Sequence, residues 1–392
     1  MAEDKQVQLK GRLEEVKELC QNRDRRVKEL KGEGRKVIGY FCCYAPIEIL
    51  TAANLVPYRI FGNIRDSITV ADTYMEPTFC PYTRSCFDVA MKGGYDVLDG
   101  YLSPDSCDNI QSLYRLWTYN FKPAYDYWLS VPHIADPASV RFFKGELVNF
   151  KNSIEEFAGS KISDQKLNQA IQLHNQNRAL SRALYELRKP DPPLVYGSEV
   201  TQILVACMSL PVAEANDLLQ GVIAELRECN DGPQEKLTRL LISGNEIDDP
   251  AFVNLVEECG ANVVTDDLCI GTKFFWHDVE TTEDPFDGLT TRYLEKIMCA
   301  RTYRGDVWGP ETRQANLEER FGHVRDFARD FNAKGAILYV LKYCDPQEWD
   351  APDFKDYLEQ AGLPVLHIEH DYTLGSFAAL RTRIQAFLEM IS

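Results

Sequence analysis

The chain has no long hydrophobic run and no excess of positive charge. No apolar segment approaches the ~20 residues that a membrane-spanning helix needs, and residues 1–30 lack the apolar core of a signal peptide. We therefore expect a cytoplasmic protein that does not enter a membrane. The formal net charge of −17 argues against nucleic acid as a partner, because phosphate binding needs a basic face.

Three common site motifs are also missing. Residues 32–36 (GEGRK) have neither the spacing nor the preceding strand of a Walker loop, and no GxGxxG segment occurs. We therefore expect no nucleotide site in this chain. No CxxC pair occurs either, which argues against a ferredoxin-type cluster site and against a zinc ribbon.

Cysteine, by contrast, is more abundant than packing requires. The chain has 12 cysteines among 392 residues, and a reducing cytoplasm argues against disulfides. Metal binding or redox chemistry is then the better explanation. The apolar fraction of 45% and the charged fraction of 26% are those of an ordinary globular protein, and the length allows two domains.

Predicted strands and helices alternate in two parts of the chain, which predicts an α/β fold with parallel sheets. We expect two Rossmann/flavodoxin-like parallel-sheet domains with a helical insertion between them. This order suggests distant structural repeats, although no sequence repeat is strong enough to prove it. Single helices are expected over residues 3–31 and 285–297. The predicted boundaries are 1–34 for an N-terminal helix, 35–145 for the first α/β domain, 146–230 for a helical segment and 231–392 for the second α/β domain.

Six cysteines share one kind of position, where a predicted strand has just ended or a helix is about to begin. Open α/β sheets build their sites at the carboxyl ends of strands, and a helix amino terminus favours a thiolate. Each cysteine alone could be a small buried hydrophobe. Together they predict an iron–sulfur enzyme or electron carrier, whose cluster would be assembled from distant loops. The six are Cys42, with Cys43 as an alternative, Cys80, Cys107, Cys269, Cys299 and Cys344.

Three charged residues near these cysteines are candidate catalytic groups. Glu48 lies on the helix after Cys42 and is either a surface carboxylate or directed at the site. Asp267 either caps a helix or turn or acts as an acid–base group. Lys273 either neutralises a cluster or a phosphate, or is solvated.

Several segments resemble the benzoyl-CoA reductase and 2-hydroxyacyl-CoA dehydratase family over nearly the whole chain. They are GYFCCYAPIEILTAANLVPYRIFG, FCPYTRS, and VLKYCDP followed by LPVLHIEHDYT. Dehydratase subunits are similar at Cys42, Cys80 and Cys344, which implies one [4Fe-4S] cluster. The further cysteines Cys107, Cys269 and Cys299 resemble the double-cubane branch, in which six cysteines hold two cubanes joined by a sulfide, an [8Fe-9S] cluster.

The resemblance implies the electron-accepting, catalytic component of an ATP-dependent low-potential reductase. Electrons would come from a separate ATP-hydrolysing iron–sulfur protein, and the chain would form a homodimer acting on a small molecule. Two alternatives remain open, each with a non-identical partner subunit and a CoA-ester substrate. One is a cluster subunit of benzoyl-CoA reductase, and the other is a subunit of a radical (R)-2-hydroxyacyl-CoA dehydratase.

Overall fold

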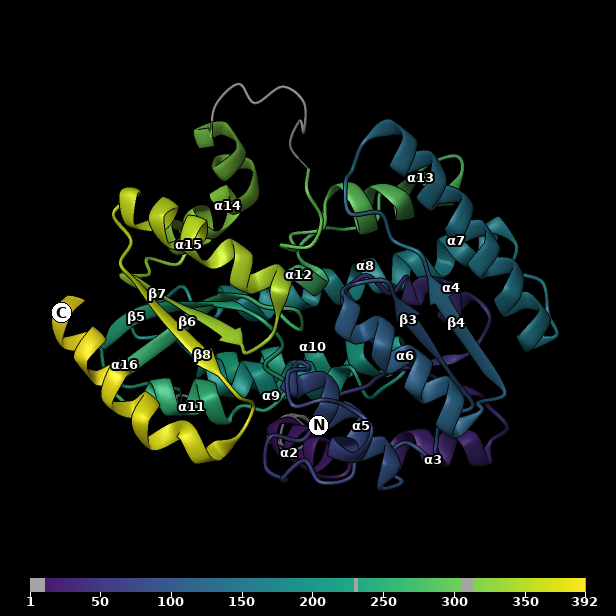
Figure 1. Ribbon diagram of the computed structural model, residues 1–392, viewed down its shortest axis with the longest axis horizontal. Helices are drawn as coiled ribbons and strands as arrows, with labels where there is room; N and C mark the ends of the chain where they lie inside the picture. Colours follow the sequence, from purple (N-terminus) through teal and green to yellow (C-terminus); the bar gives the residue numbers. More distant parts are fainter. Residues whose placement is uncertain (1–10, 229–231, 305–312, 392) are drawn as a thin grey trace.

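Two four-stranded parallel sheets organise the protein, as the computed structural model shows (Figure 1). The structure describes residues 11–228, 232–304 and 313–391. The first sheet has the order β2-β1-β3-β4 and the second has the order β6-β5-β7-β8. The strands are β1 (Val37–Tyr40), β2 (Val56–Arg59), β3 (Gly100–Pro104), β4 (Tyr125–Leu129), β5 (Thr238–Gly244), β6 (Ala261–Asp267), β7 (Gly335–Leu341) and β8 (Val365–His370).

The strand order is the same in the two sheets when each is counted from its own first strand. β1 corresponds to β5, β2 to β6, β3 to β7 and β4 to β8. Every pairing within a sheet is parallel. This is the doubly wound topology of flavodoxin-like folds, and it confirms the predicted fold class. We call the part built on β1–β4 the first half and the part built on β5–β8 the second half.

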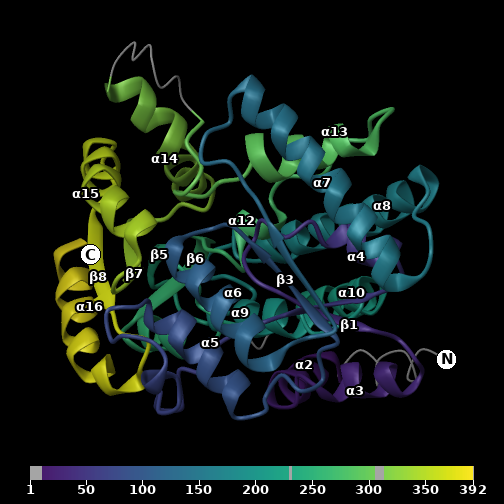
Figure 2. The same cartoon turned by 45° about the vertical axis from the view of Figure 1, so that its right-hand side comes forward.

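Helices cover the faces of both sheets, because parallel strands need crossover connections that pack back onto the sheet. In Figure 2, α15 and α16 flank β7 and β8 at the outer edge of the second half. The first half carries α4 (Ile47–Ala52), η1 (Ala71–Thr73), α5 (Pro81–Met91), α6 (Asp108–Phe121) and α7 (Pro137–Ala158). The second half carries α11 (Ala251–Glu258), α12 (Thr272–Phe275), α14 (Arg313–Asp330), α15 (Asp345–Gln360), η3 (Leu374–Ser376) and α16 (Phe377–Ile391). Between α12 and α14 in the chain, α13 (Pro285–Thr290) and η2 (Thr291–Glu295) pack on α7 of the first half.

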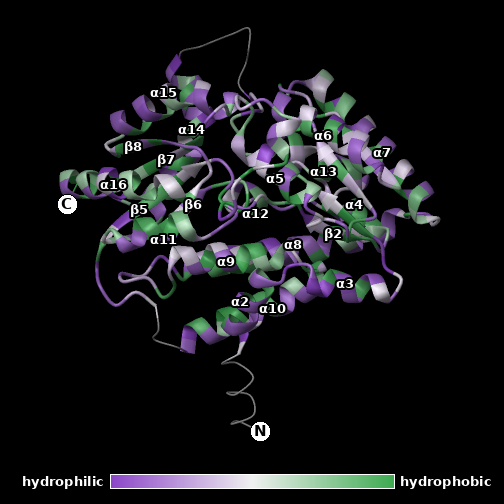
Figure 3. Ribbon diagram, turned by 60° about the horizontal axis from the view of Figure 1, so that its bottom comes forward, coloured by the Kyte–Doolittle hydropathy of each residue, from purple (hydrophilic) through white to green (hydrophobic). Residues whose placement is uncertain are grey.

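A group of helices lies beneath both halves and connects them (Figure 3). It consists of α8 (Asp164–Glu186), α9 (Gly197–Cys207) and α10 (Val212–Glu228), with the N-terminal helices α2 (Arg12–Gln21) and α3 (Arg25–Gly32). α8 contacts α4 of the first half and α12 of the second half. α9 is mostly apolar and lies above α2 in Figure 3, and α2 packs on both α9 and α10.

Two helix predictions are wrong. The helix expected over residues 3–31 is divided into α2 and α3, and residues 3–10 lie outside the described residues. Arg23 lies at the break and turns inward, where its guanidinium donates to the Ser209 hydroxyl at 2.9 Å and to the Arg59 carbonyl at 2.8 Å. The helix expected over residues 285–297 is the short α13 followed by one π-helical turn, η2.

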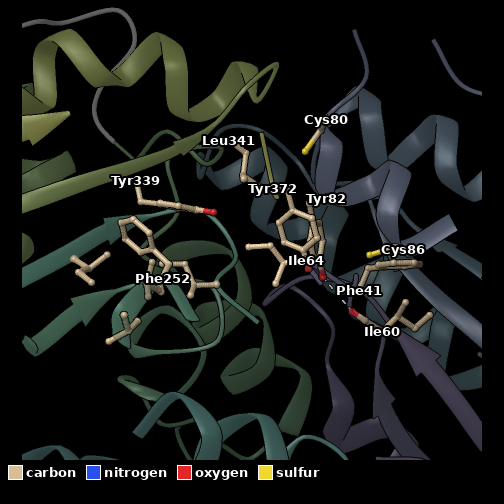
Figure 4. Packing of buried hydrophobic residues seen from close by; sticks show 14 of the residues in the cluster. Phe41, Ile60, Ile64, Cys80, Tyr82, Cys86, Phe252, Tyr339, Leu341 and Tyr372 are labelled. Atoms are coloured by element: carbon tan, nitrogen blue, oxygen red, sulfur yellow. Dashed lines mark hydrogen bonds between the residues drawn. The ribbon is translucent and has the colours of Figure 1, made fainter. Parts of the chain in front are cut away.

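One hydrophobic cluster extends across both halves, so they pack as one body (Figure 4). Tyr82 of α5 and Tyr372, which follows β8, meet edge to face with ring centroids 5.6 Å apart. Phe41 and Leu341, at the ends of β1 and β7, belong to the same cluster. Among the described helices, none is both long and apolar enough to span a bilayer.

Candidate metal centre

Five of the six predicted cysteines lie at the carboxyl edges of the sheets or at helix starts beside those edges, and Cys299 is the exception. Cys42 and Cys43 follow β1, and Cys269 follows β6. Three others are the residues just before helices: Cys80 precedes α5, Cys107 precedes α6 and Cys344 precedes α15. Cys299 lies between η2 and α14. The loops that the sequence indicated therefore carry these thiols in the folded chain.

Two of these loops turn through strained backbone. Cys42 has φ 62° and Tyr343, just before Cys344, has φ 63°. The left-handed region costs a non-glycine residue about 1–2 kcal/mol. Strain of this kind persists where the surrounding structure imposes it, and it concentrates at functional sites. Both strained residues adjoin candidate cysteines.

The first set of thiols, which we call the Cys80 group, contains Cys80, Cys107 and Cys344. All three pack on the hydrophobic cluster shared by the two halves, and Figure 4 shows Cys80 near Leu341 and Tyr372. Burial raises the pKa of each thiol, and the nearby sulfurs contribute to the rise for Cys344 and for Cys107, whose pKa is about 12. Asn245 donates its amide N–H to the Cys344 sulfur at 2.8 Å.

The second set, which we call the Cys43 group, contains Cys43, Cys269 and Cys299. Cys43 is fully buried, and its hydrogen-bonding contacts with Cys269 and Cys299 are the largest causes that raise its pKa well above the usual value. The same contact with Cys43 lowers the pKa of Cys299 to about 5; burial opposes this change and the Lys273 charge assists it. One member of this group is therefore already inclined to be a thiolate.

Cys42 lies between the two groups. It packs against the cluster that holds the Cys80 group and also against the cluster that holds Cys43. Its pKa is lowered mainly by its hydrogen bond with Cys43, and its charge raises the pKa values of Cys107 and Cys269. Both cysteines of the Cys42-Cys43 pair thus face other thiols, so the choice between them stays open.

Each group takes thiols from both halves of the molecule. The Cys80 group combines two cysteines of the first half with Cys344 of the second half, and the Cys43 group combines Cys43 of the first half with two cysteines of the second. Convergence of this kind requires the two sheet edges to face each other. Buried charge pairing supports that arrangement, because Arg59 at the end of β2 pairs with Glu246, which follows β5, at 2.9 Å.

The donor set suits a sulfur-rich cluster better than a single ion. Across residues 11–228, 232–304 and 313–391, no three His, Cys, Asp or Glu side chains are arranged to hold one metal ion. Six cysteines nevertheless gather in two sets of three with Cys42 between them, and iron–sulfur clusters are held by thiolates. Because the pKa values in the Cys80 group are raised, binding metal there would release protons.

Lys273 and Asp267 form a buried ion pair beside the Cys43 group. The Lys273 ammonium lies 3.2 Å from Asp267 Oδ2 and donates to the carbonyls of Gly244 and Asp267 at 3.0 and 2.8 Å. Burial alone would lower the pKa of Lys273, but Asp267 and the thiols Cys269 and Cys299 raise it above its usual value. Lys273 is therefore a fixed positive charge next to two thiols.

Glu48 is fully buried, and both of its carboxylate oxygens have partners. One pairs with Arg178 of α8, and the other accepts from the Tyr293 hydroxyl at 2.8 Å. Burial by itself would raise the pKa of Glu48, but the charge and hydrogen bond of Arg178 lower it to about 2. These contacts join α4, which follows Cys43, to α8 and η2. The predicted catalytic role of Glu48 stays a prediction.

A small polar pocket lies over Cys299, with a free volume of about 20 Å³, room for one or two water molecules. Asp267 and Lys273 line it, together with His323 of α14 and Asp350 of α15. Asp350 Oδ1 pairs with Arg320, whereas Oδ2 is buried without a hydrogen-bond partner. Burial raises the pKa of Asp350 to about 6. His323 and Asp350 lie inside helices and belong to no motif, so no sequence pattern marks them as site residues.

The fold and the thiols define a class: an α/β protein of two parallel sheets with buried and half-buried cysteines gathered near the carboxyl edges of these sheets. The family model described as 2-hydroxyglutaryl-CoA dehydratase, D-component, matches residues 42–391. The chain belongs to this family, which confirms the resemblance at the family level.

Two curated relatives match over almost their whole length. A benzoyl-CoA reductase subunit of Thauera aromatica is 27% identical over 363 residues, 91% of each chain. The beta subunit of (R)-2-hydroxyglutaryl-CoA dehydratase of Acidaminococcus fermentans is 24% identical over 387 residues, 97% of this chain and 98% of the relative. A solved complex of SsGBP with GDP aligns with a TM-score of 0.23 and 11% identity over 91% of this chain and 99% of that chain, which is too low to carry an argument.

Proposed function

We propose that this chain is the iron–sulfur, electron-accepting catalytic component of an ATP-dependent low-potential reductase. The observation that carries the proposal is the gathering of seven cysteines from six loops, as two adjoining sets of three with Cys42 between them. The relatives whose names include a reductase and a dehydratase support the same broad chemistry. Bound there, a cluster would accept and store electrons; burial and hydrogen bonds to sulfur would tune its potential.

The chain's own residues would hold and balance such a cluster. Ligands would come from Cys42 or Cys43 and from Cys80, Cys107, Cys269, Cys299 and Cys344. Their negative charge would be offset by Lys273 and by the amino termini of α5, α6 and α15, which begin at three of the cysteines. The pocket over Cys299 is the place where a water molecule or a proton would approach.

Two thiol sets favour a reductase with a double-cubane [8Fe-9S] cluster over a dehydratase with one [4Fe-4S] cluster. Three thiols per set suit two cubanes, and storage of more than one electron suits a difficult reduction. A second candidate is a cluster subunit of benzoyl-CoA reductase, which the 27% identity to the Thauera aromatica protein favours. That candidate would need a non-identical partner and a CoA-ester substrate.

The proposed partner is a separate ATP-hydrolysing iron–sulfur protein, because the sequence carries no nucleotide motif of its own. We also propose a cytoplasmic homodimer. The molar mass of the protein in solution tests this assembly. It should be measured for the chain alone and for the chain mixed with a non-identical subunit of the kind that the alternatives require.

Iron and acid-labile sulfide counts on anaerobically purified protein test the function. About eight irons per chain are expected for two cubanes, about four would favour the dehydratase interpretation, and none would overturn the proposal. Cys107→Ser and Cys269→Ser should each lower the iron content. Cys207→Ser is the matched control, because Cys207 ends α9 away from both thiol groups and should leave the content unchanged.

A further inference from the structure

We propose that the two thiol groups are assembled separately, and that Asn109 is the positioning residue on which the Cys80 group depends. The inference rests on the proposed function for its metal readout, but it concerns contacts present in the metal-free chain. It goes further than the proposed function, because it predicts that the Cys80 group can lose its metal while the Cys43 group keeps its own.

Asn109 connects all three loops of the Cys80 group. It is the second residue of α6, two positions after Cys107. Its Oδ1 accepts the backbone N–H of Cys80 at 2.8 Å, and its Nδ2 donates to the carbonyl of Tyr343 at 3.3 Å. Tyr343 directly precedes Cys344 and belongs to the second half. One side chain thus links two loops of the first half to a loop of the second half.

The Cys344 loop has its other polar support within its own half. Asn245 follows β5, accepts the backbone N–H of Leu341 at 2.7 Å and donates to the Cys344 sulfur at 2.8 Å. Asn245 therefore fixes Cys344 relative to β5 and β7, and does not fix it relative to Cys80 or Cys107. Among the hydrogen bonds of the described residues, the Asn109 contact is the one that spans from this loop to the first half's cysteine loops.

The Cys43 group is anchored across the interface several times over. The hydroxyls of Tyr44 and Thr302 are 2.7 Å apart, which joins the loops of Cys43 and Cys299. Tyr303 exchanges backbone hydrogen bonds with His133 and Ala135 of the first half, at 2.7 and 3.0 Å. Arg301 donates to the Pro132 carbonyl at 2.5 Å. The Cys299 loop is therefore held against the first half by several contacts, so the loss of any one of them should leave its position unchanged.

This difference predicts that the groups respond differently to loss of one side chain. Removing Asn109 releases the Cys344 loop from Cys80 and Cys107, whereas the loops of Cys43 and Cys299 keep their anchors. Arg292 of η2 also still donates to the carbonyls of Lys273 and Phe274, which follow Cys269. The iron content of Asn109→Ala should then fall to about half that of the wild type, from about eight to about four per chain.

Hydrogen exchange on the metal-free protein gives a readout independent of iron. In Asn109→Ala the Cys80 amide should exchange about fivefold faster or more, because it loses its acceptor. Asn109→Asp still provides an acceptor for Cys80 but no donor for Tyr343, so it should keep the Cys80 protection and still lose iron. Asn120→Ala is the matched control: Asn120 is a half-buried residue of the same helix whose amide donates only to Leu116, at 2.7 Å, and both readouts should stay at wild-type values.

Each outcome decides the question. Half the iron with faster Cys80 exchange supports the inference. Wild-type iron and unchanged exchange in Asn109→Ala would overturn the role of Asn109, and complete loss of iron would overturn separate assembly. If the wild type itself binds no iron, the proposed function fails, and the exchange result still decides whether Asn109 holds the Cys80 loop.

Discussion

The Cys80 and Cys43 groups each gather three thiols from separate loops, yet their surroundings differ. The Cys80 group lies among apolar side chains, with amides as its polar neighbours: Asn109 on the Cys80 loop and Asn245 on the Cys344 sulfur. The Cys43 group lies beside the buried Lys273–Asp267 pair and a polar pocket. Burial raises the pKa values of the Cys80 group and keeps its thiols protonated, whereas the fixed Lys273 cation favours a thiolate at Cys299. The two thiol groups therefore lie in two different electrostatic environments.

The largest effect on the difference between the two groups is expected when the Lys273 charge is removed. Lys273→Met should destabilise the metal-free protein by about 3–5 kcal/mol, because Asp267 stays buried without its partner. Urea unfolding measures this loss. The double variant Lys273→Met/Asp267→Asn should recover much of it, since no uncompensated charge remains. A Lys273→Met protein as stable as the wild type would show that the pair contributes little.

The same substitution also separates the two groups. Lys273→Met should raise the pKa of Cys299 from about 5, where Lys273 assists the hydrogen bond from Cys43. The Cys80 group, whose pKa values rise mainly through burial, should be unchanged. Alkylation of each cysteine across pH, read by mass spectrometry, distinguishes these outcomes.

Substitution of Glu48 tests whether this buried carboxylate, which lies on the helix after Cys43, stabilises the fold or takes part in catalysis. Its pKa falls from 4.5 to about 2 on folding, so it stabilises the protein fully above pH ~4.5, and that stabilisation is lost as pH falls toward 2. Glu48→Gln should cost about 3 kcal/mol at pH 7 and less at acid pH. A large loss of activity with unchanged stability would instead support the catalytic role.

The ionisation of Asp350 should change stability with pH in the opposite direction to that of Glu48. Its folded pKa of about 6 lies above the usual 3.8 because of burial, so its ionisation destabilises the protein as pH rises from about 4 to about 6. Asp350→Asn keeps an acceptor for Arg320 and should be more stable than the wild type by about 2–3 kcal/mol at pH 8, with no difference at pH 3.5. Thermal unfolding at both pH values measures this. Equal stability at pH 8 would mean that Asp350 is not held in a desolvated pocket.

The sequence predicts the parts of this site that depend on the order of strands and helices, and does not predict the parts that depend on how the two sheets pack. Alternating strands and helices predict parallel sheets, and parallel sheets gather their strand ends at one edge. Cys42, Cys107, Cys269 and Cys344 were predicted together on that basis. The division into two groups was not predictable, because it depends on how the two sheet edges face each other, and no local pattern encodes that.

The charged candidates show the same limit. Lys273 and Asp267 were found because they lie close to Cys269 in sequence, and the structure places both in the pocket lining. Asp350 and His323 reach that pocket from α15 and α14 through packing of those helices. Asn109 was missed although it lies two residues after Cys107, because a side chain that links loops of different halves looks like any polar residue in a first helical turn.

The smallest expected loss of stability and iron comes from a substitution in the Cys299 loop, which several contacts hold in place. Thr302→Val removes the hydroxyl that lies 2.7 Å from Tyr44 and should cost about 1 kcal/mol of stability. It should leave the iron content near the wild-type value, because Tyr303 and Arg301 still join the Cys299 loop to the first half. Thr201→Val, which removes another buried threonine hydroxyl bonded to the Gly197 carbonyl at 3.1 Å, is the control for cost without proximity to thiols. If Thr302→Val lost as much iron as Asn109→Ala, both groups would depend on single contacts, and the contrast in anchoring would be wrong.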